Sequence, residues 1–196
     1  MPRYAGINHL AMVTGDMDAT IRFWRDLLGM RLVVGLGRPG YRHYFFEISG
    51  SDMIAFFEWP DAEPATMKDH GFPVRGPVAF DHVSIGVEGE EDLWEVKALL
   101  EGAGFEPSEV VDHGFIHSVY AFDPNNVPIE FSWAVSGADP RLRPAMVDHA
   151  PSATTMKGPE PQTGHWPDVT IEPKAEREIY AGEGREVLNP ARNRWK

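Results

Sequence analysis

Histidine and glutamate stand at corresponding places in two similar stretches of the chain, and side chains of these types can ligate a divalent metal. His9 lies in the alternating segment INHLAMV, and His82 lies in the comparable segment FDHVSIGV. Glu58 lies near the end of MIAFFEW and Glu130 lies within VPIEFSW, so each histidine is followed by a glutamate after a nearly equal length of chain. A lone strand histidine is more often an ordinary polar residue, but this repetition favours a shared site.

Glu130 in particular requires a positively charged partner. Ile129 and Phe131 flank it in a segment whose alternation predicts a strand. An unpaired carboxylate in the interior is costly, because burial removes its hydration. We therefore expect a cation beside Glu130.

The elements that must position these side chains follow the order β-α-β-β-β twice. In each copy an alternating strand comes first, and a stretch with helical periodicity follows an acidic turn. The helices are expected over Asp18–Leu28 and Glu91–Leu100, and glycines follow both, as is common at helix C-termini. The strands are expected at 7–13, 31–36, 41–48, 53–59, 80–87, 106–111, 116–122 and 127–133.

Strand alternation also predicts which side chains face a cavity that contains the histidines. Successive residues of a strand point to opposite faces. On this basis Phe46, Phe56 and Phe122 are expected to point inward and to form an apolar wall. His43 and His117 are expected to point away from it.

The composition of the chain limits the classes of binding partner that it can have. The chain has 196 residues, and 30 Asp and Glu against 18 Lys and Arg give a formal net charge of -12. This balance argues against nucleic acid or an anionic membrane as a partner, because both attract basic surfaces. No apolar run reaches the roughly 18 residues that a membrane span requires, and the N-terminus has no signal-peptide core. The absence of cysteine excludes disulfides and thiolate ligands. We expect a soluble, cytoplasmic protein.

The C-terminal part of the chain differs in kind. Residues 136–196 are rich in proline and poor in aliphatic residues, with one short helix expected near 174–179. Such a segment cannot form its own core, so we expect it to pack on its own domain or on a partner subunit. Its large apolar side chains are Trp166, Ile171, Ile179, Tyr180, Val187, Leu188 and Trp195.

On these residues the chain resembles the vicinal oxygen chelate superfamily, whose members build a half-open barrel from paired β-α-β-β-β modules around a divalent metal. The resemblance covers residues 5–135, with modules at about 5–60 and 78–135, and leaves the extension 136–196 without a counterpart. It implies an α+β fold with two modules in a mixed half-open β-barrel. Members of this superfamily include glyoxalase I, fosfomycin-resistance enzymes, bleomycin-binding proteins and type I extradiol dioxygenases, so the fold alone does not select a function.

The ligand set that the resemblance implies is His9, His82 and Glu130. Two histidines and one carboxylate leave three coordination positions open, which is typical of non-haem Fe(II) oxygenases. A catecholate takes two of these positions and O2 takes the third. We therefore expect Fe(II), with Mn(II) as an alternative metal.

The segment VDHGFIHSVYAFDPNNVPIE resembles the signature of type I extradiol dioxygenases. Its matching elements are His113, Tyr120 after an aliphatic residue, an Asp-Pro turn and the ligand Glu130. Asn126 stands where that family prefers Gly or Pro, but asparagine tolerates the left-handed geometry of a turn. His70, which precedes His82 between the modules, matches the acid–base histidine by position.

The resemblance thus implies an Fe(II) extradiol dioxygenase that cleaves a small catechol-type substrate with O2. Tyr120 or a histidine would assist loss of the second substrate proton. His113 would hydrogen-bond a substrate oxygen, and His70 would act in acid–base catalysis, since an imidazole titrates near pH ~6.5. A homodimer or a higher homo-oligomer is expected, because a two-module unit has exposed sheet edges.

Two alternatives remain open from the sequence. With Glu58 as a fourth ligand, the site would suit a glyoxalase-like lyase or isomerase that uses Ni(II) or Zn(II). Without a metal, the same cavity would hold an aromatic ligand in a binding or resistance protein.

Overall fold

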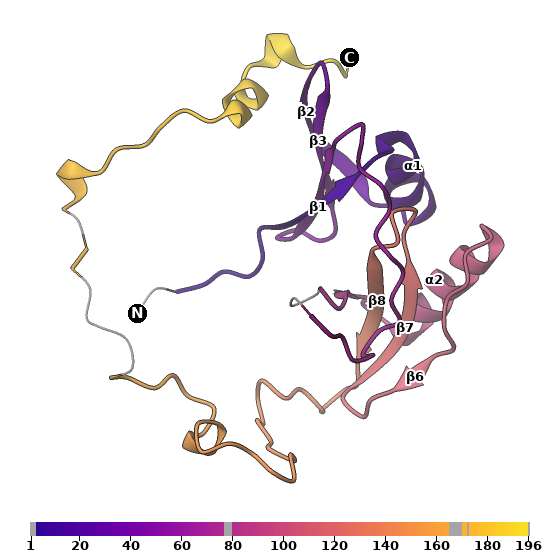
Figure 1. Ribbon diagram of the computed structural model, residues 1–196, viewed down its shortest axis with the longest axis vertical. Coiled ribbons are helices and arrows are strands. Elements are labelled where there is room, and N and C mark those ends of the chain that lie inside the picture. The colour runs from indigo at the N-terminus through magenta and orange to yellow at the C-terminus, as the bar shows by residue number, and fades with distance from the viewer. Residues whose placement is uncertain (1–2, 77–79, 165–169, 172, 196) are drawn as a thin grey trace.

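The structure is a computed structural model that describes residues 3–76, 80–164, 170–171 and 173–195. Two β-sheets lie one above the other, with helices on one side of both and the C-terminal segment making a wide loop on the other side (Figure 1). Each sheet has four strands, and no strand pairing joins the two sheets within the described ranges. The predicted α+β fold of two β-α-β-β-β modules with a C-terminal extension is confirmed.

The first module forms a sheet of order β1-β4-β3-β2, in which β1 and β4 are parallel. A short helix, α1, continues directly into the π-helical segment η1 and covers one face of this sheet. The elements are β1 (His9–Thr14), α1 (Met17–Ile21), η1 (Arg22–Leu27), β2 (Arg31–Arg38), β3 (Tyr41–Glu47) and β4 (Met53–Glu58).

The second module repeats this order as β5-β8-β7-β6, again with one parallel pair, β5 and β8. Its helix is longer, and β6, the strand at one edge of the sheet, has only two residues. The elements are β5 (Val83–Gly86), α2 (Glu90–Gly102), β6 (Val111–Asp112), β7 (Ile116–Phe122) and β8 (Pro128–Ala134).

Both helices begin and end where the sequence predicts. The Asp16 side chain accepts a hydrogen bond from the Ala19 amide at the start of α1, and Asp92 binds the Gly89 amide at the start of α2. Gly29 and Gly104 follow the helical segments with φ of 75° and 83°, a conformation that glycine adopts without strain.

The two modules share one hydrophobic core. Trp24 of η1 is fully buried, and its Nε1 donates to Asp123 Oδ2 in the β7–β8 turn at 3.2 Å. Thr14 Oγ1 at the end of β1 donates to Asn125 Oδ1 of the same turn at 2.6 Å. The core side chains are Met17, Phe23, Trp24, Phe46, Ile54, Phe56, Ile85, Leu93, Leu100, Val119, Ala121, Ile129 and Phe131. The modules are therefore packed through their helix-bearing faces.

Replacing Trp24 by alanine is expected to lower the free energy of unfolding by about 3–5 kcal/mol, the usual cost of emptying a large aromatic site. The variant would also leave the buried Asp123 without its indole donor. Urea unfolding followed by circular dichroism measures the loss. Trp59→Ala is the matched control, because that indole is 45% exposed. Equal losses in the two variants would contradict this account of the core.

The predicted apolar wall is wrong for the first module. Phe46 and Phe56 lie on the helix side of their strands and are fully buried, with the Phe56 ring 5.7 Å from Trp24. The opposite, helix-free face carries His43, which stacks on Phe57 at 3.6 Å. An error of one residue in the inferred alternation exchanges the two faces of a strand, and this error affected both β3 and β4.

In the second module the predicted faces are correct. Phe122 lies on the helix-free face of β7, where its ring is 5.2 Å from His70. His117 lies on the opposite face, with Nδ1 3.2 Å from Glu90 of α2 and its ring 5.4 Å from Trp133. The helix-free faces of both sheets turn toward the side where the C-terminal segment runs (Figure 1).

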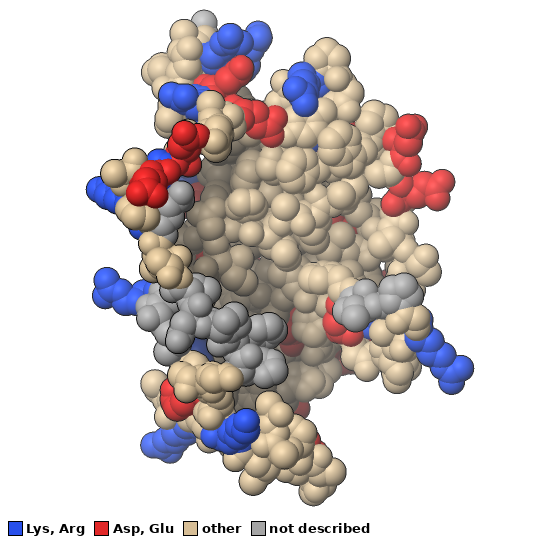
Figure 2. All heavy atoms as spheres, turned by 60° about the vertical axis from the view of Figure 1, so that its left-hand side comes forward, with Lys and Arg blue, Asp and Glu red and all other residues tan. Residues whose placement is uncertain are grey.

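The C-terminal extension returns to the first module near its end. The segment η4 (Glu183–Leu188) contacts β2, and Glu183 accepts a hydrogen bond from the Tyr41 hydroxyl. The predicted helix at 174–179 is the single turn η3 (Lys174–Glu176), and Trp166 lies outside the described residues. Figure 2 shows a hollow between this extension and the domain, and the visible charged side chains lie mainly near the outline of the molecule. No helix among the described residues is long and apolar enough to span a bilayer.

Candidate metal centre

The second module brings His82 and Glu130 together. In the parallel pairing of β5 with β8, Ser84 lies opposite Glu130, so His82, two residues earlier, shares the face of that carboxylate. His82 Nε2 is 3.3 Å from Glu130 Oε2. Two of the three predicted metal ligands are therefore adjacent on the helix-free face of this sheet.

Tyr120 and His113 extend this pair into a hydrogen-bonded chain. Tyr120 lies opposite Glu130 in the β7–β8 ladder, and its hydroxyl donates to Glu130 Oε1 at 2.9 Å. His113 Nε2 is 2.9 Å from the same hydroxyl. Because the hydroxyl has a single proton and gives it to Glu130, His113 Nε2 is the donor in the second bond.

The protonation states in this chain follow from burial and hydrogen bonding. Burial, followed by the bond to Glu130, raises the pKa of Tyr120 to about 12. Burial alone would raise the pKa of Glu130, which is 4% exposed, but the nearby hydroxyls of Ser118, Ser84 and Tyr120 outweigh it and lower the pKa. Near neutral pH the site therefore holds a carboxylate and a protonated phenol.

His70 lies against the same cluster, as its position in the sequence suggests. Its ring is 4.5 Å from Tyr120 and 5.6 Å from His82. Burial, and then the neighbouring His82, lowers the pKa of His70. The ring is therefore neutral near pH 7 and can accept a proton.

His9 lies elsewhere, at the start of β1 on the helix-free face of the first sheet. It is exposed, its Nδ1 is 2.9 Å from Asn8 Oδ1, and its ring is 5.2 Å from Phe45. In the part of the chain that the structure describes, no three His, Asp or Glu side chains converge on a possible metal position. The structure joins two predicted ligands and separates the third.

Glu58 is not the counterpart of Glu130, although their places in the sequence suggest it. In the β1–β4 pairing, Ala11 lies opposite Ala55, so Ala55 occupies the position that Glu130 has in the second module. Glu58 points to the helix side, where it accepts a hydrogen bond from the Met17 amide at 2.8 Å and pairs with Arg42. Sequence separation alone misassigned it, because it does not determine which face a strand residue takes.

The turn that departs from the dioxygenase signature keeps its geometry. Asn126 has φ of 58°, and its amide donates to the Asp123 carbonyl at 2.9 Å. The expectation that asparagine supports left-handed geometry here is confirmed.

Two functional candidates were missed from the sequence. Asp81 Oδ1 is 2.7 Å from His82 Nδ1, and Asp81 Oδ2 accepts from Lys68 Nζ at 2.8 Å. The signal for Asp81 was its place directly before the histidine in FDHVSIGV. Lys68 had no such signal, because its contact crosses the connection between the modules.

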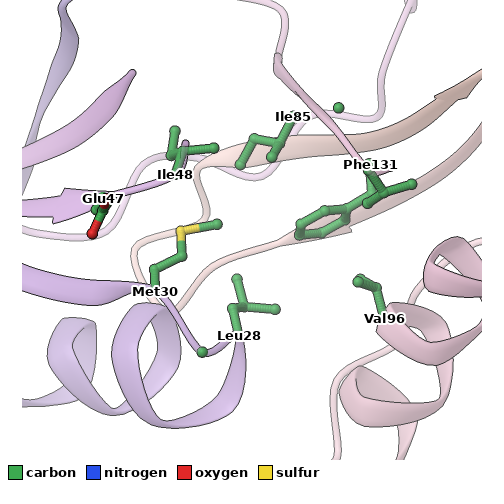
Figure 3. A pocket seen from close by; sticks show the side chains of 10 residues that line it. Leu28, Met30, Glu47, Ile48, Ile85, Val96 and Phe131 are labelled. Atoms are coloured by element: carbon green, nitrogen blue, oxygen red, sulfur yellow. The ribbon is translucent and has the colours of Figure 1, made fainter. Parts of the chain in front are cut away.

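A separate gap lies between the modules and contains none of these residues (Figure 3). Ile85 and Phe131 line it, and both alternate with Ser84 and Glu130 along their strands. The gap therefore lies on the opposite side of the sheet from His82 and Glu130. Leu28, Met30 and Val96 also line it, together with the charged side chain of Glu47.

Comparison with known proteins agrees with this architecture. The sequence profile of the Glyoxalase/Bleomycin resistance protein/Dioxygenase superfamily matches residues 6–131. A lactoylglutathione lyase from Haemophilus influenzae is 26% identical over 136 residues, which cover 64% of this chain and 90% of that protein. A glyoxylase/bleomycin resistance protein/dioxygenase domain from Frankia sp. has a TM-score of 0.57 at 20% identity, covering 69% of this chain and 96% of that one. For a fosfomycin resistance protein from Listeria monocytogenes the TM-score is 0.51 at 15% identity, with coverage of 69% and 98%.

The chain belongs to the Glyoxalase/Bleomycin resistance protein/Dioxygenase superfamily, since the profile spans well over half of it. The predicted resemblance is confirmed at this level. The two relatives with a named activity are a lyase and a resistance protein, and members of one fold carry out different reactions. The choice of reaction therefore depends on the site.

Proposed function

We propose that the protein is an Fe(II)-dependent extradiol dioxygenase that uses O2 to cleave a catechol-type ring beside its vicinal hydroxyls. The observation that carries this proposal is the register of the first sheet, which puts Ala55 where a second carboxylate ligand would stand. Two histidines and one carboxylate leave three metal positions open, which suffices for two substrate oxygens and O2. A second carboxylate would occupy one of them.

The residues of the second module fit a divalent metal. His82 Nε2 and Glu130 Oε2 already face each other, and Asp81 lies at the other ring nitrogen of His82, where carboxylates commonly accept a hydrogen bond from metal-binding histidines. His82 and Glu130 would hold Fe(II), which would supply the redox chemistry that a catecholate and O2 require. Mn(II) would fit the same nitrogen and oxygen donors.

The side chains around Glu130 would handle the protons. A catechol that binds through both oxygens must lose hydroxyl protons, and the neutral His70 can accept one and return it during ring opening. Tyr120 keeps its own proton, with its pKa raised to about 12, and remains a donor. His113 would hydrogen-bond a substrate oxygen from its exposed position beside Tyr120.

The third ligand, His9, would come from a second copy of the chain. β1 and β5 are both edge strands, each with one free side. The segment before β1 is exposed, with Tyr4 and Ile7 at 90% and 66% exposure. A two-fold pairing of β1 with the β5 edge of another copy would add His9 to His82 and Glu130 twice, which gives two equivalent sites.

The glyoxalase-like alternative rests on the distant relationship to a lactoylglutathione lyase. It requires four ligands, and Glu58 is held on the helix side by Arg42 and the Met17 amide. The metal-free binding protein has no need of a carboxylate beside a histidine in a hydrogen-bonded chain. Both alternatives serve as arms of the functional test.

The test is to load the protein with Fe(II) without oxygen, then to admit air with a panel of catechols and record the yellow ring-fission product. The proposal expects cleavage that depends on Fe(II), together with oxygen uptake equal to product. A parallel assay uses Ni(II) or Zn(II) with methylglyoxal and glutathione. Turnover in that assay, with no catechol cleaved, would overturn the proposal in favour of the lyase.

Deleting residues 140–196 is expected to weaken the homodimer and to speed the loss or oxidation of iron. The extension presents Ile179 and Leu188 at 98% and 83% exposure, and these side chains would bury apolar surface against a neighbouring subunit. Light scattering over a dilution series, and the rate of iron transfer to a chelator, measure the two effects. Tyr41→Phe is a milder variant that removes only the donor to Glu183. A truncated chain with unchanged dimerisation, stability and activity would contradict this role.

A further inference from the structure

Asp81 orients the ring of His82 through a hydrogen bond at Nδ1, the ring nitrogen that does not face Glu130. The Nε2 of His82 faces Glu130, and in the proposed metal site this nitrogen would offer its lone pair to the cation. Nδ1, 2.7 Å from Asp81 Oδ1, then carries the ring proton and donates it. The partner of the second nitrogen sets the tautomer and the ring plane of a metal-binding histidine in this way.

The same carboxylate holds the loop of residues 68–72. Asp81 Oδ2 accepts from Lys68 Nζ at 2.8 Å, and the Gly71 amide is 3.1 Å from Oδ1. Lys68 Nζ also donates to the carbonyls of Asp69 and Phe72, at 2.9 and 3.4 Å. All three ammonium protons are therefore used, and the loop is wrapped around this one charged group. Lys68, followed by His82 and the Gly71 amide, lowers the pKa of Asp81.

His70 lies in the middle of this loop and depends on it for its position. Its ring packs at 4.5 Å from Tyr120 and 5.2 Å from Phe122. Its Nε2 is buried and has no hydrogen-bond partner among the described residues. No hydrogen bond from Nε2 holds the ring, so the position of His70 depends on its ring packing, on its interaction with the Ile129 backbone and on the anchoring of its loop to Asp81.

We propose that Asp81 is a positioning residue that couples the two sides of the site, with one carboxylate oxygen fixing the metal ligand His82 and the other fixing, through Lys68, the loop that presents His70. The ligand half of this proposal, which concerns His82, rests on the proposed metal site. The loop half, which concerns residues 68–72, rests on contacts within the chain alone. Loss of Asp81 is therefore expected to weaken metal binding and to loosen residues 68–72. Loss of Lys68 alone is expected to loosen residues 68–72 and to leave metal affinity nearly unchanged.

The first test compares Asp81→Ala with Asp26→Ala, which removes an exposed carboxylate paired with Arg25. Calorimetric titration with Mn(II) is expected to show a Kd about 10–100-fold weaker for Asp81→Ala, the usual effect of removing the hydrogen-bond partner of a metal ligand. The Kd of Asp26→Ala is expected to be unchanged. Hydrogen exchange measured by mass spectrometry is expected to be faster over residues 68–72 in Asp81→Ala only. If Asp81→Ala does not fold, Asp81→Asn is used instead: its amide oxygen is a weaker, uncharged acceptor for His82, so a smaller loss of Mn(II) affinity is expected, while its ion pair with Lys68 is lost and exchange over residues 68–72 still rises.

The second test separates the halves with Lys68→Met. This variant keeps the Asp81–His82 hydrogen bond, so its Mn(II) Kd is expected to lie within about 3-fold of the wild-type value. That change is smaller than the one expected when the hydrogen-bond partner of a metal ligand is removed. Exchange over residues 68–72 rises, and the nuclear Overhauser contacts between the His70 and Phe122 rings disappear. Lys97→Met, which removes the Glu101 ion pair on α2, is the matched control.

The outcomes distinguish this inference from the proposed function. Wild-type Mn(II) affinity in Asp81→Ala, or unchanged exchange of residues 68–72 in Lys68→Met, would overturn the inference alone. A wild-type chain that binds no Mn(II) would overturn the ligand half together with the proposed metal site. Metal binding and loop order that follow the expected pattern support the inference even if no catechol is cleaved.

Discussion

Glutamine in place of Glu130 is expected to abolish Fe(II) binding, whereas glutamine in place of Glu58 is expected to leave it intact. Glu130 is buried at 4% exposure, and its carboxylate faces His82 at 3.3 Å. The isosteric amide has no charge and only one acceptor oxygen, so it cannot serve both Tyr120 and a cation. Since loss of an outer-shell partner already weakens metal affinity by 10–100-fold, loss of the ligand itself should exceed about 100-fold.

The Glu58→Gln variant is the matched control for this experiment. Its oxygen can still accept from the Met17 amide, so the start of α1 is preserved while the Arg42 ion pair is weakened. Calorimetric titration with Fe(II) under nitrogen compares the two variants, and circular dichroism verifies that both are folded. Equal loss of metal in both would show that Glu58 is a fourth ligand and would favour the lyase. His9→Ala and His82→Ala are expected to behave like Glu130→Gln.

The second large effect is expected on turnover rather than on metal binding. Tyr120→Phe and His113→Ala should retain iron and lose turnover by roughly 10²–10⁴, the usual size of an acid–base or electrostatic contribution. Tyr120 gives its proton to Glu130, and His113 donates to Tyr120, so each variant interrupts the chain at one bond. Iron content and kcat are measured on the same preparations.

Two control variants, at a tyrosine and a histidine outside the candidate site, make this result specific. Tyr44→Phe removes a hydroxyl on β3 from the helix side of the first sheet, opposite Phe56. His117→Ala removes a histidine from the helix side of β7, where it contacts Glu90 and Trp133. Both are expected to turn over at close to the wild-type rate. Near wild-type activity in Tyr120→Phe and His113→Ala would remove the main reason to prefer a dioxygenase.

Much of the candidate site of the second module could be predicted from sequence, because its residues are close together along the chain or are placed by regular periodicity. Tyr120 and Glu130 belong to one hairpin, β7 and β8, whose register follows from the tight turn at Asn126, and His113 lies just before β7 in the turn after β6. His82 joins them through the single parallel pairing of β5 with β8. Within such a unit, the spacing of residues determines which side chains share a face.

The first module shows where that reasoning stops. Its strands were located correctly, yet Phe46, Phe56 and His43 were assigned to the wrong faces, and Glu58 was equated by position with Glu130. The length between His9 and Glu58 nearly equals that between His82 and Glu130, but strand alternation has a period of two residues, and a difference of one reverses the face. Only the pairing of Ala11 with Ala55 reveals which position corresponds to Glu130.

The sequence by itself determined the two β-α-β-β-β modules, the ends of their helices and the grouping of His113, Tyr120 and Glu130, because caps, periodicity and tight turns act over a few residues. The tertiary structure alone decided the exclusion of Glu58, the separation of His9 from His82, and the Lys68–Asp81 anchor that places His70. Each of these depends on which distant segments pair or pack. That choice reflects the free energy of the whole core rather than the preference of any local stretch.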